Sequence, residues 1–275
     1  MVALLVLSLI AVSIGLRALP AQAAGAGAPG VKSLTAELST STRTLERESA
    51  EANRLAAATP SGAFATAQAA MQAGAAEQRF RDSVRTEQKA IYLLAGNPPL
   101  ADRVERQLGS QAPAGLPSVL AALQALFTLA GETAPSPAFD HPYNAALPLP
   151  VLEGYYQGAA RQQGLEWEYL AAINFLESSF DRNTSDSPAG AQGPMQFIPS
   201  TWDLYGDGGN IRDPHDAIYA AARYLHAMGA PANYPLAIRR YNNDGNYVAA
   251  VRDLAAAIAT DGLWMQRLYY WNTYG

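Results

Sequence analysis

The side chain best suited to acid–base chemistry is that of Glu177, at the end of a segment with helical periodicity. Leu170 and Ile173 lie seven and four positions before it, so the three share one face of a helix over 167–178. A carboxyl group held against apolar side chains has a raised pKa, because burial penalises its charged form. Such a group can protonate a leaving oxygen at neutral pH, which cleavage of a glycosidic bond requires. On its own, the pattern also fits a solvated glutamate or one paired with Arg182.

A long loop rich in Gly, Ser, Pro and Asp follows this helix, from about residue 180 to 210. Loops of this length inside a compact domain are usually functional. Gly190 and Gly193 allow a close backbone approach or a positive φ. Gln196 offers an amide donor and a carbonyl acceptor, which suit sugar hydroxyl and N-acetyl groups. The loop is therefore a candidate wall of a sugar-binding site.

Large apolar side chains accompany these polar ones. Met195, Phe197 and Trp202 could supply soft and flat surfaces on which a sugar ring lies. The same side chains also suit a hydrophobic anchor beneath a structural turn. The sequence leaves both interpretations open.

Short helices with clear start and stop signals must position these side chains. We expect helices over 151–163, 167–178, 214–228, 235–241 and 247–259. Asp213 can cap the third of them, and Pro214 fits its first position because the missing N–H would be unpaired there. Asn246 can cap the last one. The aromatic residues of the tail, 264–274, either seal the helices together or line a groove.

Three motifs in this region together resemble those of the soluble lytic transglycosylases. Glu177–Phe180 is similar to their glutamate–serine signature, and Ser187–Trp202 is similar to their glycine-rich and methionine–glutamine–phenylalanine segment. Tyr241-Asn242 looks like the tyrosine–asparagine motif that closes their groove. Order and spacing agree over about 151–254, and the end of the second motif is closer to the membrane-bound B-type branch. The resemblance implies an all-α fold, with a lysozyme-like C-terminal domain preceded by a helical N-terminal region.

The resemblance also implies substrate-binding roles for the residues that match. Ser187 and Gln196 would contact the N-acetylated sugars on either side of the scissile bond. Tyr241 would hydrogen-bond near the glutamate or the acetamido group, and Asn242 would support that wall. Met195 would pack beneath the sugar.

The mechanism implied by the resemblance needs one carboxyl group, that of Glu177. As catalytic acid/base of a peptidoglycan lytic transglycosylase, it would protonate the leaving oxygen of the MurNAc-β-1,4-GlcNAc bond while the substrate's acetamido group attacks the anomeric carbon. It would then take the proton of the 6-hydroxyl, which closes a 1,6-anhydro ring. Ordinary glycosidases use a second carboxylate. The acids near the motifs are better explained as turn and capping residues; they are Asp181, Asp186, Asp203 and Asp207.

The sequence leaves three other functions open. A hydrolytic muramidase of the same fold would keep Glu177 and need a second carboxylate, for which Asp186 is a candidate. A non-catalytic cell-wall-binding module would keep the aromatic residues and tolerate loss of the glutamate. A structural helical protein would act through its N-terminal half.

The N-terminal segment, 1–23, is interpreted as a signal peptide or an uncleaved anchor. An apolar run over 2–16 precedes the small-residue triplet Ala21-Gln22-Ala23, as at a cleavage site. We therefore expect a secreted or cell-envelope protein, with a membrane tether only if the segment is not cleaved.

The chain between this segment and the motifs falls into two parts. Residues 24–132 are mainly alanine-rich and helical, with helices expected over 33–58, 63–94 and 117–129 and no evident role. Five prolines mark 133–150 as a linker, since proline at that density does not continue a helix. Residues 151–275 then form the catalytic domain.

Composition excludes several classes of function. The formal net charge is −5 and no long basic run is present, so nucleic acid is not an expected partner. The resemblance to lytic transglycosylases implies peptidoglycan glycan strands as the partner instead. The absence of cysteine removes disulfides and thiolate metal sites. His141, His215 and His226 lack the spacing of metal ligands, and Asp207–Asn210 fits a turn better than a calcium loop. We expect no metal and no other cofactor.

Overall fold

The computed structural model describes residues 16–18, 29–57, 63–131, 135–137, 144–183 and 185–271. Most of the expected signal segment and His141 in the expected linker lie outside these residues. The chain divides into two compact units, Ala21–Ala114 and Gly115–Gly275 with Met1–Pro20. Each unit is described by itself below.

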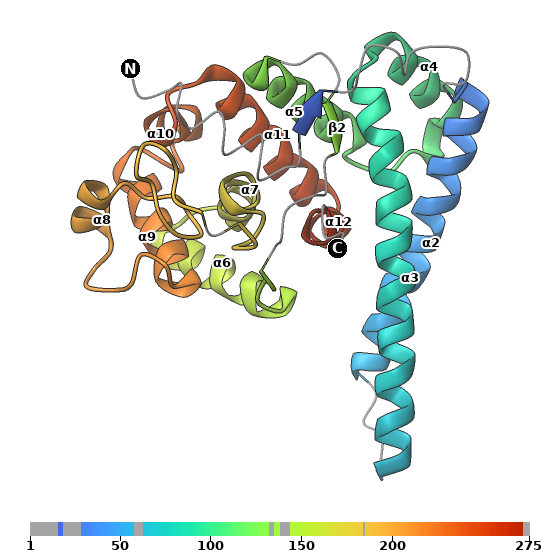
Figure 1. Ribbon diagram of the computed structural model, residues 1–275, viewed down its shortest axis with the longest axis horizontal. Coiled ribbons are helices and arrows are strands. Elements are labelled where there is room, and N and C mark those ends of the chain that lie inside the picture. Colours follow the sequence, from blue (N-terminus) through green and yellow to red (C-terminus); the bar gives the residue numbers. More distant parts are fainter. Residues whose placement is uncertain are drawn as a thin grey trace. The chain divides into compact units, whose positions relative to one another are not determined.

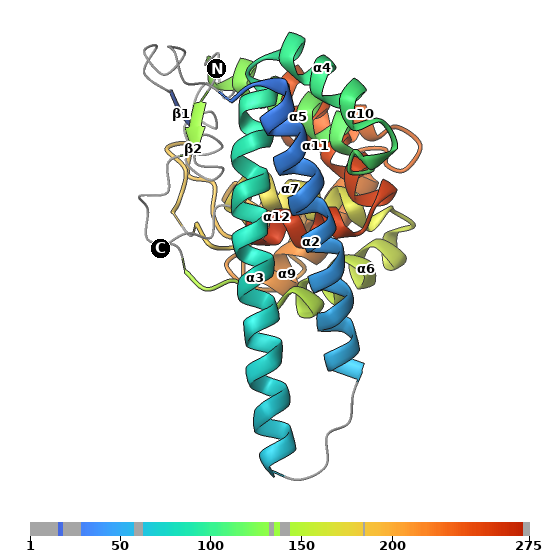
Figure 2. The ribbon, with the colours of Figure 1, turned by 90° about the vertical axis from the view of Figure 1, so that its right-hand side faces the viewer.

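The unit Ala21–Ala114 is built on a helical hairpin. Helix α2 (Val31–Ala57) and helix α3 (Ala63–Ala95) run side by side, as Figure 2 shows, and both were expected from the sequence. Their interface mixes buried leucines with paired polar groups: the Thr42 hydroxyl donates to Glu87 over 3.0 Å, and buried Glu48 forms an ion pair with Arg79.

A shorter helix, α4 (Pro98–Leu108), and the 3₁₀ turn η2 (Gly109–Gln111) complete this unit. The Asn97 side chain accepts a hydrogen bond from the Leu100 N–H, and two prolines occupy the first turn. No helix was expected from the sequence between 94 and 117, so α4 is an addition. Residues 97–99 end one helix and begin the next.

The unit that contains Gly115–Gly275 is a cluster of helices around α7 (Figure 1). Its helices are α5 (Leu116–Ala130), α6 (Leu149–Gln163), α7 (Trp167–Ser178), α8 (Pro199–Tyr205), α9 (Pro214–Ala227), α10 (Tyr234–Tyr241), α11 (Gly245–Thr260) and α12 (Leu263–Tyr270). Every residue of α7 from Leu170 to Ser178 is buried, and α6, α9, α11 and α12 contact it. A helix that is apolar on nearly all sides belongs in the centre of a domain.

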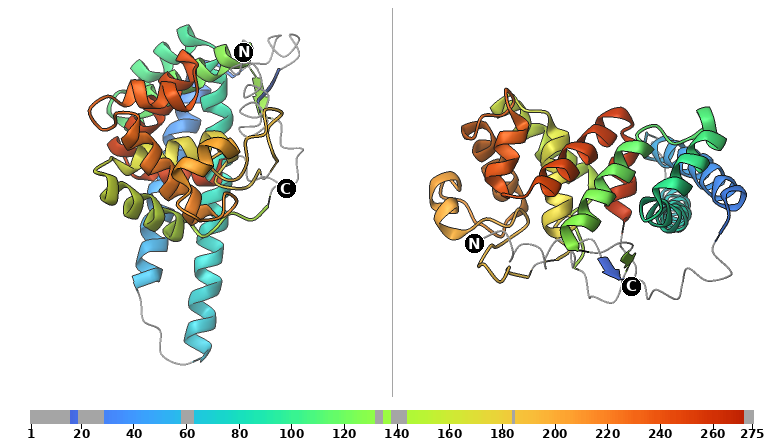
Figure 3. Two further views of the ribbon diagram at one scale, coloured as in Figure 1. Left: turned by 90° about the vertical axis from the view of Figure 1, so that its left-hand side faces the viewer. Right: turned by 90° about the horizontal axis from the view of Figure 1, so that it is seen from above.

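The position of α5 differs from the expected domain division. We placed the helix over 117–129 with the N-terminal region, whereas α5 packs along α11 within the C-terminal unit, where Figure 3 shows them side by side. Its apolar residues, among them Leu120 and Phe127, are buried there. The approach is close at Gly115, where a Cβ atom would lie 2.8 Å from Nε1 of Trp264. The division therefore falls before α5 and not at the proline-rich segment.

Helices dominate the described residues, so the all-α fold class, expected to be lysozyme-like, is confirmed. The exception is one small antiparallel pair of strands, β1 (Leu16–Ala18) and β2 (Pro135–Pro137), in register Arg17 to Ser136. Two of the three residues of β2 are prolines, which lack the N–H that a larger sheet would need. Among the residues with described positions, no helix is both long and apolar enough to span a membrane.

Candidate active site

Glu177 lies in the last turn of α7, where the polar end of the helix meets the long loop. Its side chain is only 4% exposed, and its Oε1 atom accepts a hydrogen bond of 2.5 Å from the Tyr247 hydroxyl. Burial raises the pKa of Glu177 to about 7, and the bond from Tyr247 opposes this rise. The carboxyl can therefore exist in both protonation states near neutral pH, and the expectation of a buried acid is met.

Tyr247 is a site residue that the sequence analysis did not identify. It lies in the first turn of α11 and is fully buried. Asp244 caps this helix, because its Oδ1 accepts hydrogen bonds from the Asn246 and Tyr247 N–H groups. The expected cap was Asn246. The signal available in the sequence was a tyrosine at the start of a helix that directly follows the tyrosine–asparagine motif.

The turn after Glu177 is locked to the loop by hydrogen bonds. Ser179, Phe180 and Asp181 have φ values of 52°, 63° and 66°, so three successive residues without glycine adopt the left-handed region. Ser178 Oγ donates to the Pro194 carbonyl over 2.7 Å and accepts from the Asp181 N–H. These bonds hold the strained turn and fix the end of α7 against the residues before Met195.

The glycine-rich loop forms a tight hairpin. Gln192 and Phe197 exchange two backbone hydrogen bonds, of 2.9 and 3.0 Å. Gly193 has a φ of 72°, and a Cβ atom there would collide with the Ile211 carbonyl oxygen. Glycine is therefore required at this position both by conformation and by the close backbone approach that the sequence indicated.

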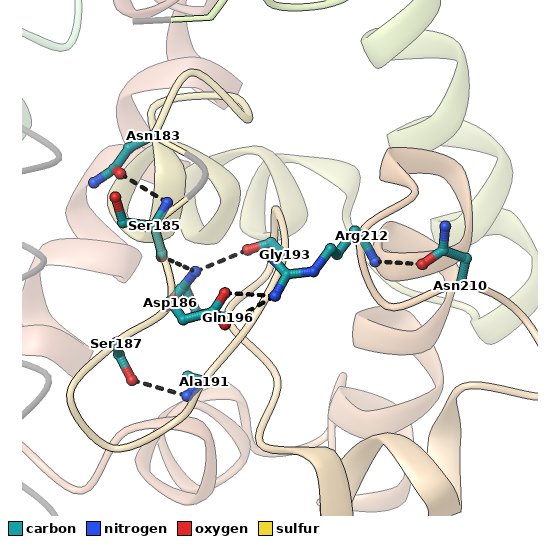
Figure 4. A network of polar contacts seen from close by, with 9 residues as sticks. All are labelled: Asn183, Ser185, Asp186, Ser187, Ala191, Gly193, Gln196, Asn210 and Arg212. Carbon is teal, nitrogen blue, oxygen red and sulfur yellow. Dashed lines mark hydrogen bonds and ion pairs between the residues drawn. The ribbon is translucent and has the colours of Figure 1, made fainter. Parts of the chain in front are cut away.

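The Gln196 side chain is held at the end of this hairpin (Figure 4). Its Nε2 atom donates to the Gly193 carbonyl over 3.0 Å and to the Ser185 carbonyl over 3.4 Å. Its Oε1 atom is buried and has no hydrogen-bond partner among the described residues. A buried acceptor without a partner is costly, so this oxygen is a candidate to receive a donor from a ligand.

The other expected substrate-binding residues lie in or beside the same loop. The buried Ser187 hydroxyl oxygen accepts a hydrogen bond from the Ala191 N–H over 2.9 Å. Met195 is fully buried, and its carbonyl accepts a 2.5 Å bond from the Tyr241 hydroxyl. Asn242 is buried at the end of α10. Tyr241 thus reaches the loop backbone, and the tyrosine bonded to the glutamate is Tyr247.

Tyr241 also interacts electrostatically with Glu177. Burial and the negative charge of Glu177 raise the pKa of Tyr241 well above its ordinary value. Its ring packs against Phe197, whose ring centroid lies 5.8 Å away, and against Tyr224. Phe197 and Met195 are buried, which decides in favour of a core role for both, whereas Trp202 is partly exposed.

The acidic residues near Glu177 differ in their surroundings. Asp181 is partly buried, and burial and the charge of Asp213 raise its pKa to about 6. Asp186 is 42% exposed and is bound through both carboxylate oxygens by Nη2 of Arg212, at 2.7 and 2.8 Å (Figure 4). Desolvation is thus the main cause of the raised pKa of Asp181, as it is for Glu177.

The segment considered for calcium is a turn. Asp207 has a φ of 53°, and the Asn210 N–H donates to Asp216 Oδ2 over 2.9 Å. Ligand atoms of Asp213, His215 and Asp216 lie within 4.8 Å of one another. Asp213 is the cap of α9 and Asp216 the acceptor of the turn, so capping and turn contacts account for both acids.

Residues 154–257 match the family model described as the transglycosylase SLT domain. These residues belong to the SLT domain family. The matched segment includes Glu177, the glycine-rich loop, the tyrosine–asparagine motif and Tyr247. The recognition of the lytic transglycosylase family from three short motifs is therefore confirmed for the SLT domain.

Two relatives illustrate the similarity. The membrane-bound lytic murein transglycosylase F of Thiobacillus denitrificans is 30% identical over 121 residues, which are 41% of this chain and 25% of the relative. The membrane-bound lytic murein transglycosylase F 1 of Alkalilimnicola ehrlichii is 34% identical over 80 residues, or 29% of this chain and 16% of the relative. The chain thus covers a quarter or less of the length of these relatives. Both carry the F designation, whereas the motifs pointed toward the B type.

No solved structure matches the chain. The SLT domain is therefore related to known proteins through its sequence.

Proposed function

We propose that this protein is a peptidoglycan lytic transglycosylase that cleaves the MurNAc-β-1,4-GlcNAc bond without water and leaves 1,6-anhydromuramic ends. The observation that supports this most is Glu177, a buried carboxyl with a pKa of about 7 at the end of the central helix of an SLT domain. A group with this pKa can both give and take a proton near neutral pH. The relatives named as murein transglycosylases agree with the same reaction.

In the first step, the protonated Glu177 carboxyl donates its proton to the glycosidic oxygen. The bond between that oxygen and the anomeric carbon breaks, and the acetamido oxygen of the muramic acid bonds to the anomeric carbon in its place. The GlcNAc side leaves with a free hydroxyl. The glutamate is left as a carboxylate, which the Tyr247 hydroxyl stabilises through the bond to Oε1.

In the second step, the Glu177 carboxylate removes the proton of the muramic 6-hydroxyl. The 6-oxygen attacks the anomeric carbon and displaces the acetamido oxygen, which closes the 1,6-anhydro ring. No water is consumed, and Glu177 is protonated again. Because the attacking group belongs to the same sugar, the reaction gains from proximity. One buried carboxyl is sufficient for both steps.

The glycine-rich loop is proposed to hold the substrate. The buried Oε1 of Gln196 accepts a hydrogen bond from an acetamido N–H or a sugar hydroxyl. Ser187 contacts the sugar on the other side of the bond, and Met195 supports the loop from beneath. Tyr241 and Asn242 form the wall opposite, with Tyr241 tied to the loop through the Met195 carbonyl.

The proposed substrate also indicates where the protein works. Peptidoglycan strands lie outside the cytoplasmic membrane, and the apolar segment at 2–16 is a feature of exported chains. We propose that the protein is secreted or acts in the cell envelope, tethered to the membrane if the segment is retained. Nucleic acid is not a partner in this proposal.

The proposal is tested by digestion of purified peptidoglycan with the natural chain and with Glu177→Gln. The amide cannot supply a proton, so we expect the release of soluble fragments to fall by at least ~100-fold, the usual range for general acid–base catalysis. Glu168→Gln, the same change at the other end of α7, is the matched control and should digest normally. Equal digestion by Glu177→Gln and the natural chain would refute the assignment.

A further inference from the structure

Arg212 is a cation beside the glycine-rich loop. Its backbone N–H donates to Asn210 Oδ1 over 3.0 Å, and the missing side chain of Gly193 leaves room for the backbone of residues 211 and 212. Its side chain reaches back to Asp186, next to Gly193 and Gln196, as Figure 4 shows. The guanidinium group is thus directed toward the loop that carries Gln196.

The guanidinium group of Arg212 keeps donors available. A guanidinium has five N–H groups in a fixed, planar arrangement. Nη2 alone makes both bonds to Asp186, and among the described residues the Nε and Nη1 groups have no hydrogen-bond partner. The side chain is 48% exposed. These donors therefore face a region that solvent or a ligand can enter.

The ion pair with Asp186 has little value for stability alone. Pairs in which both partners are this exposed contribute about 0–1 kcal/mol. The pair does orient the guanidinium, which lowers the ordering cost when it binds a ligand. Arginine forms its strongest fixed-geometry contacts with planar anions, above all carboxylates.

We propose that Arg212 binds a carboxylate of the stem peptide that branches from the muramic acid of the glycan strand. This inference rests on the proposed function of the SLT domain. The sugars of such a strand are neutral once the lactyl group is joined to the peptide, so the nearest negative charges are those of the stem. A net charge of −5 gives the chain no general attraction for an acidic polymer, so a local cation must supply it. Arg212 then selects strands that carry peptides with free carboxylates.

Binding tests the inference without catalysis. We would measure calorimetrically the affinity of the Glu177→Gln chain for a tetrasaccharide with stem carboxylates and for the same compound with carboxamides. The carboxylate form should bind about tenfold more tightly, the equivalent of one charge-assisted contact. Adding Arg212→Gln should abolish the preference, and Arg212→Lys should restore part of it. Arg161→Gln on α6, which changes the net charge equally, should keep the full preference.

Two results would overturn the inference: no preference in the Glu177→Gln chain, or a preference that survives Arg212→Gln. If Arg212→Gln loses affinity for both compounds alike, Arg212 has a structural role and the inference is refuted as well. Cleavage of the carboxamide compound by the chain with Glu177 intact tests the proposed function separately. That cleavage can fail while the carboxylate preference holds, and the reverse is equally possible.

Discussion

At the scale of single residues, the site depends on one hydrogen bond between two buried groups. Burial raises the pKa of Glu177 and the hydrogen bond from the Tyr247 hydroxyl lowers it, so that the pKa lies at about 7. In the proposed reaction the glutamate must be an acid first and a base second. A pKa near the working pH serves both steps. Tyr247 is therefore a positioning residue for the proton transfer.

Tyr247→Phe is predicted to shift the pH dependence of cleavage. The first step needs protonated Glu177, so kcat/KM falls as the pH rises through the pKa of that group. Loss of the hydroxyl removes a bond that stabilises the carboxylate, which raises the pKa and moves the falling limb to higher pH. We expect a shift of about one unit, since a bond to a charged group contributes ~1.5–3 kcal/mol.

The measurement is kcat/KM on soluble glycan strands between mildly acidic and alkaline pH. The control is Tyr169→Phe, near the start of α7 and stacked on Tyr234. It should leave the pH at which kcat/KM falls unchanged. A limb that stays unchanged or moves to lower pH in Tyr247→Phe would contradict the role of the hydroxyl.

At the scale of elements, the loop is shaped by backbone contacts rather than by its apolar side chains alone. The Pro194 carbonyl accepts from Ser178 and Asn174 of α7, and Gly193 lies against the backbone after Ile211. These contacts join the end of α7, the hairpin and the segment before α9. The geometry of Gln196 follows from this junction.

Two glycine substitutions distinguish the energetic cost of a positive φ from the cost of a steric clash. Gly190 and Gly193 both have positive φ, but a Cβ atom meets nothing within 4 Å at Gly190 and collides with the Ile211 carbonyl at Gly193. Gly190→Ala should cost about 1–2 kcal/mol of unfolding free energy, the penalty of the left-handed region. Gly193→Ala should cost clearly more and reduce cleavage, because the hairpin must move. Thermal unfolding compares them, and equal losses would contradict the crowding argument.

The helices that hold the site could be predicted because capping residues and apolar periodicity are signals contained within a few neighbouring residues. The helix over 167–178 has the predicted bounds, and Asp213 with Pro214 begins α9 as expected. The short helix α8 was missed, since its seven residues lie inside a glycine- and proline-rich stretch. Glu177 was found through its motif. Its partner Tyr247 was not, because a contact between residues 70 positions apart leaves no local pattern.

At the scale of the whole chain, the C-terminal unit extends beyond the SLT match. The family match begins at residue 154, yet α5 packs on α11 and buries leucines along its length. The prolines after α5 suggested a boundary from composition, whereas contacts between residues distant in sequence place α5 with the helices that follow. The unit needs this helix to cover α11.

Fragments test this division. A fragment over 115–275 should unfold cooperatively and keep the cleavage activity of the chain. A fragment over 133–275 lacks α5, so the surface of α11 that packs against α5 is exposed to solvent. Each large apolar side chain left without a partner lowers the unfolding free energy by ~1.5–3 kcal/mol. We expect this fragment to melt at a much lower temperature or not to fold, as monitored by circular dichroism. Equal melting temperatures would show that α5 is dispensable.

The central claim is that Glu177 cleaves the glycan without water. It is tested most directly by digestion of purified peptidoglycan in water enriched in the heavy oxygen isotope, with the products identified by mass spectrometry. The account predicts muramic ends that are one water lighter than reducing ends, carry no heavy oxygen, and are absent from the Glu177→Gln digest. Reducing ends that carry the heavy isotope would contradict it, and would indicate a hydrolytic muramidase with Asp181, the other carboxyl with a raised pKa beside the site, as the first candidate for its second carboxylate.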